Sequence, residues 1–264
     1  NTPPTLIKNH PDVQRMLYFQ KAIVEGSMGL LFQCFMWDDL AKSLEGEEKK
    51  EAQMMLDLMT TVAKTYPAEM GTQAVNQGLQ VLGGYGYTED FPLEQMARDV
   101  RIMSIYEGTT GIHGLTLLGR GIPANNGAAL QTLGKLVYAD IAVAKGHESI
   151  AKYAGILEKE LENLTKVTMH KLGFAMKGEI EVFLADSTLY MELFGLITVA
   201  WQWLKQGHVA AAALAKGGLS AEDEAFYKDK IHTMKFFYHY EVPKALGLSK
   251  RLMDEEVLTI FDHK

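Results

Sequence analysis

Glu107 lies between a tyrosine and a glycine in the stretch IYEGTTGI, directly before a predicted helix. A carboxylate at this place allows two interpretations. It can be an anion that the helix dipole stabilises near a helix N-terminus. It can also be a general base in an apolar cleft, where burial adjusts its proton affinity. The local pattern leaves both interpretations open.

A second feature with chemical potential is the glycine-rich turn GGYG at residues 83–86. It is not a P-loop, because no Lys-Ser/Thr pair follows, and it does not follow a strand as the dinucleotide-binding fingerprint does. It predicts a helix C-cap and a turn. Consecutive glycines also leave backbone N–H groups open to a ligand. Gln80 lies one helical turn before Gly84 and is expected on the same side.

Metal chemistry has no support in the sequence. Helical di-iron bundles use Glu-x-x-His pairs, which this chain lacks, and its eight histidines are scattered. Cys34 is the single cysteine, so it cannot form an internal disulfide. That usage fits a reducing compartment, and we expect a cytoplasmic protein.

Charge and hydropathy exclude two further classes of partner. The chain has 26 basic and 33 acidic residues and a net charge of −7, so nucleic acid is not an expected partner. No run of 18 uncharged apolar residues is present, so no membrane span is expected. The opening NTPPTLIKNHP does not have the pattern of a signal peptide.

The elements that must position Glu107 and the glycine turn are helices. Apolar residues recur at helical spacing along most of the chain, and alternating strand patterns are nearly absent. The spacing predicts helices over 11–44, 47–82 with a kink or break at Pro67, a short helix after Pro92, 109–121, 128–146, 147–177, 180–216, 220–246 and a piece near 250–260. Ser220 and Asp223 resemble a capping pair. We therefore predict an all-α protein, an up-and-down four-helix bundle followed by a second helical bundle.

The segment GIPANNG at 121–127 is the best domain boundary, because its proline and glycines interrupt the helical pattern. It divides the chain into a first domain at 1–122, which carries the loop region 80–113, and an additional helical domain at 123–264.

Several phrases resemble the C-terminal helical domain of the acyl-CoA dehydrogenases. They are LQVLGGYGY, PLEQMARDVRI, IYEGTTGI and LLGR, in this order and at this spacing. Each is weak alone, and together they are specific. The resemblance covers about residues 6–122. The remainder, about 127–264, resembles the extra helical domain of a longer subfamily that includes methylthiopropionyl-CoA dehydrogenase-like enzymes.

The resemblance implies a mechanism. In this family a glutamate removes the α-proton of a CoA thioester, a hydride leaves the β-carbon for the flavin, and a trans-2-enoyl-CoA is formed. The matching residue here is Glu107, and its own backbone N–H would help to polarise the thioester carbonyl. Tyr106 matches an aromatic neighbour of substrate and flavin, and Gly108 keeps the approach clear.

The resemblance also implies FAD as the cofactor. Gln80 and Gly84 match residues that contact the adenosine–pyrophosphate part of the flavin from the neighbouring subunit, Gly83 adds to that backbone, and Thr109 matches a flavin-contacting hydroxyl. A homo-oligomer is therefore expected, as is an electron-transfer flavoprotein as the acceptor.

The family also has an N-terminal helical domain and a middle β-domain, which this chain lacks. We therefore expect a C-terminal fragment of a longer enzyme that is inactive alone. Two alternatives stay open at this point: a non-catalytic helical assembly module of the same fold, and an acyl-CoA oxidase-like enzyme.

Overall fold

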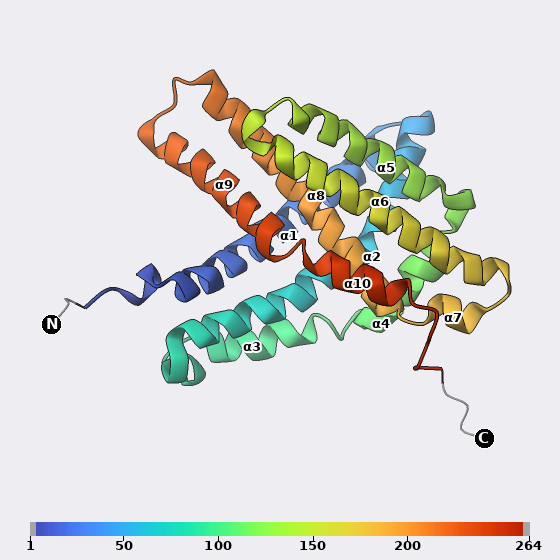
Figure 1. The fold of residues 1–264 in the computed structure, drawn as a ribbon, viewed down its shortest axis with the longest axis horizontal. Helices are drawn as coiled ribbons and strands as arrows, with labels where there is room; N and C mark the ends of the chain where they lie inside the picture. The colour runs from blue at the N-terminus through green and yellow to red at the C-terminus, as the bar shows by residue number, and fades with distance from the viewer. Residues whose placement is uncertain (1–3, 261–264) are drawn as a thin grey trace.

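A computed structural model describes residues 4–260, and helices carry nearly all of them, with no strand in that range. Long helices cross one another at several angles, and the first and last described segments lie at opposite sides of the structure (Figure 1). The elements are η1 (Ile7–Asn9), α1 (Pro11–Ser43), α2 (Gly46–Leu82), η2 (Gly83–Tyr87), α3 (Leu93–Ile102), α4 (Thr110–Thr116), η3 (Leu117–Gly121), α5 (Ala124–Lys145), α6 (Glu148–Met176), α7 (Ile180–Leu184), α8 (Ser187–Lys216), α9 (Ala221–Tyr240) and α10 (Lys244–Leu252).

The helical fold class predicted from the sequence is confirmed. Helix α1 begins at a proline that needs no N–H partner in the first turn, and α2 runs back along it. Helix α3 then returns beside the last turns of α2 (Figure 1). This arrangement places the turn η2 at one end of α3 and the Glu107 segment at the other end.

The sequence predicts a kink or a break at Pro67, and the structure contradicts the break. Helix α2 is continuous from Gly46 to Leu82 although a proline in a helix interior costs about 3 kcal/mol. Its neighbours Tyr66, Ala68 and Met70 are all buried. Burying one large apolar side chain stabilises by about 1.5–3 kcal/mol, so packing against the rest of the molecule offsets the lost hydrogen bond.

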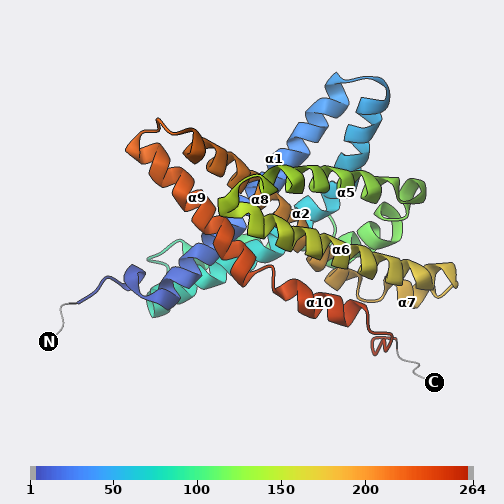
Figure 2. The same ribbon diagram turned by 45° about the horizontal axis from the view of Figure 1, so that its top comes forward.

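Helix α8 is the central helix of the structure. It packs on α1, α2 and α4 of the first part of the chain and on α5, α6, α9 and α10 of the second (Figure 2). Its segment Tyr190–Leu204 is buried almost all round, as expected for a helix inside a core. Gly26 of α1 lets Trp203 approach closely, and the Trp203 Nε1–H donates to the carbonyl of Ala22 at 3.0 Å. The two parts of the chain therefore share one hydrophobic core.

The second half contains more helix breaks than the sequence predicted. The expected helix over 180–216 is two helices, α7 and α8, separated by Asp186 with a positive φ of 60°. The expected helix over 220–246 ends at Tyr240, and α10 follows at Lys244–Leu252. The predicted cap is confirmed, because the Ser220 hydroxyl accepts from the backbone N–H of Asp223 at 3.0 Å.

Candidate active site

The segment that carries Glu107 joins α3 to α4 and has an unusual backbone. Glu107 has a φ of 54° and Gly108 a φ of 97°, both in the left-handed region. A glutamate pays a steric cost there that a glycine does not, of order 1–3 kcal/mol. Such a conformation persists only where the surroundings impose it.

Two side chains hold the carbonyl groups of Glu107 and Gly108, the two residues of this segment with left-handed backbones. The Lys64 ammonium, from the middle of α2, donates to the carbonyl oxygen of Gly108. The His113 ring places Nε2 at 3.1 Å from the carbonyl oxygen of Glu107. Because a carbonyl can only accept, this contact requires the proton on Nε2. His113 also explains the glycine at 108, since a Cβ there would lie 2.8 Å from Nε2.

A second set of contacts ties the segment to α2 through Glu69. The Thr110 hydroxyl donates to the Glu69 carboxylate, and Arg101 lies 3.6 Å from it. Arg101 also donates to the Ser104 hydroxyl at 2.7 Å, and the Thr110 N–H donates to the Ser104 carbonyl at 3.3 Å. The end of α3, the start of α4 and the middle of α2 are thereby fixed to one another.

The side chain of Glu107 takes no part in this network. It is exposed, and no residue from 4 to 260 donates a hydrogen bond to its carboxylate or pairs with it. Tyr106 beside it is 51% exposed, and Ile105 and Ile112 are exposed as well. Lys64 and His113 hold the backbone of this segment, while the side chains of Glu107 and its apolar neighbours face solvent. This face is therefore open to a ligand or to further protein.

The backbone N–H of Glu107 is free as well. The amide of Tyr106 donates to Ile102 at 3.0 Å and that of Thr110 donates to Ser104. No described acceptor receives the N–H of Glu107. An unused N–H and an unused carboxylate therefore belong to the same residue.

The glycine turn lies at the far end of α2. Gly83 ends the helix with a φ of 60°, and its N–H donates to the carbonyl of Gln80. Gly83 and Gly84 are exposed, and a Cβ on either would meet no atom within 4 Å. Gly86, in contrast, is buried against the backbone of Leu79. The predicted cap and turn are therefore present, with open space beside the first two glycines.

The structure does not bring the two predicted parts of the site together. Lys64 and Glu69 hold the Glu107 segment at the middle of α2, whereas Gln80 lies near its end. At 1.5 Å per residue these positions are about 17–24 Å apart along the helix. Thr109 lies in the Glu107 segment and caps α4, because its hydroxyl accepts from the N–H of Ile112 at 3.4 Å.

Behind the Glu107 segment lies a polar cavity of about 280 Å³, between α2, α4 and α8. Thr65 and Tyr66 line it with hydroxyls that have no hydrogen-bond partner among residues 4–260, and Glu69 and Glu192 line it with carboxylates. Burial raises the pKa of Glu192, the charge of Glu69 adds to this, and Lys244 opposes it. A polar cavity of this size has room for several water molecules. This cavity is not visible in the sequence, because its walls come from segments far apart in the chain.

Two family models cover most of the chain. "Acyl-CoA dehydrogenase, C-terminal domain" matches residues 9–122, and "Acetyl-CoA dehydrogenase C-terminal like" matches residues 131–260. The chain belongs to the acyl-CoA dehydrogenase family. The family predicted from the motifs around Glu107 is thereby confirmed. The site residues and the division at 122 stay predictions.

The relatives are longer proteins with acyl-CoA dehydrogenase names. The chain is 30% identical to the broad-specificity linear acyl-CoA dehydrogenase FadE5 of Mycobacterium tuberculosis, over 89% of this chain and 39% of that protein. It is 30% identical to 3-methylmercaptopropionyl-CoA dehydrogenase of Ruegeria pomeroyi, over 94% of this chain and 42% of that protein. The chain thus spans about two fifths of the length of these relatives.

Two solved structures share the fold. Caenorhabditis elegans ACDH-11, in complex with C11-CoA, matches with a TM-score of 0.67 at 22% identity, over 89% of this chain and 37% of that one. An acyl-CoA dehydrogenase of Bacillus anthracis, complexed with FAD, matches with a TM-score of 0.67 at 18% identity, over 96% and 43%.

Two further properties concern residues 4–260. None of their helices combines the length and the apolar character that crossing a membrane requires. No three His, Cys, Asp or Glu side chains among them come together in a group that could hold a metal ion.

Proposed function

We propose that this chain supplies the catalytic base of an FAD-dependent acyl-CoA dehydrogenase that desaturates the α,β-bond of an acyl-CoA thioester. The Glu107 carboxylate takes the α-proton, and the β-carbon loses a hydride, so the saturated acyl group becomes a trans-2-enoyl group. Family membership and the names of the relatives support the reaction class.

The conformation of Glu107 is the observation that carries the proposal. A glutamate occupies a left-handed backbone position that favours glycine, and His113 and Lys64 hold its own carbonyl and that of the next residue, Gly108. That cost is unexplained if the residue is only an anion near a helix start, because an exposed carboxylate there stabilises by about 0.3–1 kcal/mol. It is explained if the carboxylate must project at a fixed angle toward a substrate.

The unused N–H of Glu107 supports a second role for the same residue. When a base removes an α-proton, negative charge develops on the thioester oxygen, and a fixed N–H donor stabilises that charge. Glu107 offers an N–H that no described residue uses. Gly108 has no side chain to obstruct the approach, and Tyr106 offers an exposed aromatic face.

The residues assigned to FAD fit such a group. Gln80, Gly83 and Gly84 form an exposed surface at the end of α2, where the absence of Cβ atoms lets a pyrophosphate approach the backbone. Thr109 offers a hydroxyl beside Glu107. When bound, FAD supplies the acceptor for the hydride from the β-carbon. The family resemblance further favours an electron-transfer flavoprotein as the next acceptor.

The spacing of these residues favours a homo-oligomer. One extended cofactor that touches both Gly84 and Glu107 of the same chain must span about half of α2, roughly 22–30 Å, whereas two chains can share a site across an interface. Helix α1 also exposes apolar side chains, among them Phe32 at 62% and Phe35 at 58%, a typical property of an interface.

A cytoplasmic location also remains our proposal. Cys34 is the single cysteine, and burial raises the pKa of its thiol to about 11.

The test uses the whole FAD-loaded protein without oxygen. Wild type, Glu107→Gln and Glu48→Gln are mixed with a panel of saturated acyl-CoAs, and loss of the oxidised flavin absorbance is followed. Glu48 is an exposed residue in the first turn of α2 and serves as the control. We expect rapid bleaching in wild type and Glu48→Gln and almost none in Glu107→Gln. Equal bleaching in all three would place the base elsewhere.

A further inference from the structure

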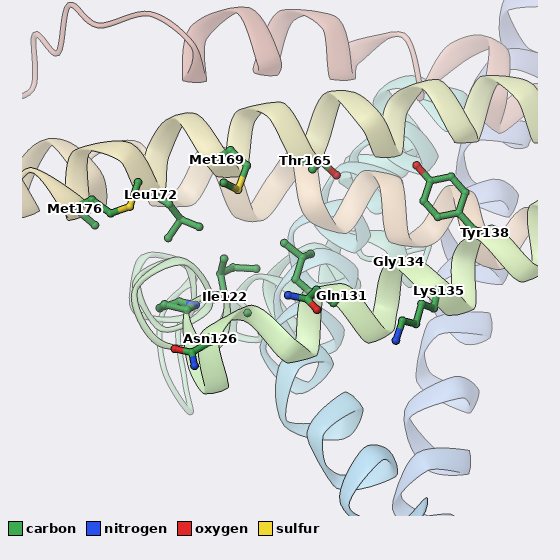
Figure 3. A pocket seen from close by; sticks show the side chains of 14 residues that line it. Ile122, Asn126, Gln131, Gly134, Lys135, Tyr138, Thr165, Met169, Leu172 and Met176 are labelled. Carbon is green, nitrogen blue, oxygen red and sulfur yellow. The ribbon is translucent and has the colours of Figure 1, made fainter.

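A large open groove lies away from the Glu107 segment. It has a volume of about 880 Å³ between the antiparallel helices α5 and α6, and none of its lining residues belongs to 80–113 (Figure 3). On α6 it runs from Thr165 to Met176, about 17 Å of helix. This volume is within the range of small-molecule sites, about 300–1,000 Å³.

One end of the groove is mainly apolar. Ile122 forms a buried part of the wall, and Leu172 and Met176 face the same end (Figure 3). Met169 is 58% exposed and Met176 is 80% exposed. Methionine side chains are flexible and adapt to irregular apolar ligands, and clustered exposed apolar side chains are typical of a binding surface.

The other end carries the charged group and two hydroxyls. Thr165 and Tyr138 lie there (Figure 3), and Lys135 is nearby on α5. Lys135 is the one charged residue among those that line the groove. It is exposed and forms no ion pair with any residue from 4 to 260. The groove is thus mainly apolar at one end, where Asn126 is the polar exception, and carries a cation at the other.

Gly134 keeps the middle of the groove open. It lies inside α5, where a glycine costs about 1 kcal/mol relative to alanine. A Cβ at this position would meet no atom within 4 Å, so close packing does not require the glycine. The missing side chain leaves free space in a groove that a larger residue would fill.

We propose that this groove binds a single-chain amphipathic anion, such as a long-chain carboxylate, with its tail along Leu172 and Met176 and its head beside Lys135 and Tyr138. The unpaired cation selects an anion by charge complementarity. The groove has the size of a ligand site, whereas a stable protein interface buries about 800 Å² on each partner. The site is independent of Glu107 and of the proposed dehydrogenation.

The experiment is isothermal titration calorimetry of the full chain with dodecanoate below its micelle concentration. We expect one bound molecule per chain and weaker binding of dodecyltrimethylammonium, which has the opposite charge. Gly134→Leu should lose about tenfold or more in affinity, because the new side chain occupies the groove. Lys135→Glu should lose about two- to fivefold, as expected for a charge exposed to solvent.

Matched controls separate these effects from changes in folding. Gly155→Leu places the same side chain on another open glycine, in α6, outside the groove, and Lys159→Glu reverses another exposed lysine of α6. Both should bind dodecanoate as wild type does. The proposal is overturned if wild type binds no dodecanoate, or if Gly134→Leu binds it with wild-type affinity. A dimer in light scattering that Gly134→Leu dissociates, without fatty acid binding, would make the groove an interface between copies instead.

Discussion

Gly114 determines how closely α4, and with it the Glu107 segment, can approach α8. A Cβ added at Gly114 would lie 2.8 Å from the carbonyl oxygen of Ser187, 3.0 Å from its carbonyl carbon and 3.1 Å from the N of Thr188. These atoms are backbone atoms in the first turn of α8, so no side chain can rotate away. Gly114→Ala must therefore move one helix relative to the other.

The magnitude follows from two opposing effects. Overpacking in a dense interior costs about 1–3 kcal/mol, and contact with fixed backbone places this site in the upper half of that range. Alanine recovers about 1 kcal/mol of helix propensity relative to glycine. We therefore expect Gly114→Ala to lower the free energy of unfolding by about 1–2 kcal/mol. For a chain of this size that is a fall in Tm of about 2–8 °C.

The assay is thermal unfolding followed by circular dichroism, with Gly155→Ala as the matched control. Gly155 lies inside α6, and a Cβ there would meet no atom within 4 Å. The same substitution should therefore raise Tm by about 2–4 °C there. A Gly114→Ala chain that melts at or above wild type would refute the close approach of α4 to α8.

Three further predictions concern the site and its surroundings. Burial and the charge of Glu69 raise the pKa of Glu192 above its ordinary value of 4.5 in the folded chain. Between the unfolded and the folded pKa the folded state therefore binds more protons than the unfolded state. The free energy of unfolding falls as pH rises through that range. Chemical denaturation should show Glu192→Gln gaining stability over wild type as pH rises above 4.5, and a constant difference would contradict the shift. Lys64→Met removes the donor to the Gly108 carbonyl, so limited proteolysis should cut the Glu107 segment faster than in wild type, and an unchanged rate would mean that this anchor is dispensable. Phe32→Ser should lower the average mass in light scattering if the exposed face of α1 is an interface, whereas a wild-type mass would place the contact elsewhere.

The sequence predicted the elements well where the cause was local. Periodic apolar residues and end signals such as Ser220 with Asp223 act over a few positions, and they are visible in a single stretch. It failed at Asp186, and at Pro67 it could not decide between a kink and a break, because distant contacts decide at both positions. Tyr66 and Met70 are buried beside Pro67 and keep α2 intact. Asp186 is held at a positive φ while Arg251 of α10 lies 3.2 Å from its carboxylate.

The same distinction applies to the candidate site. The motif around Glu107 could be found in the sequence, because a carboxylate between Tyr106 and Gly108 before a helix is a local pattern. The residues that hold this motif could not be found in the sequence. Lys64 and Glu69 belong to another helix, and no local sequence pattern around them indicates their contacts with the Glu107 segment. The strain at Glu107 is likewise visible only in the backbone angles.

The distance between the glycine turn and Glu107 leads to a test of how subunits would share a site. If Gly84 of one chain and Glu107 of its neighbour serve the same cofactor, then a dimer of Glu107→Gln with Gly84→Asp has one site with both defects and one site with neither. Such a dimer should regain about half of wild-type activity, although each parent is inactive. The aspartate replaces a glycine beside open space, so it repels a pyrophosphate without disturbing the fold. If both residues serve one cofactor within a chain, every site of the mixed dimer is defective and no activity returns. Co-expression of the two whole proteins with different affinity tags, followed by purification of the mixed species, distinguishes these outcomes.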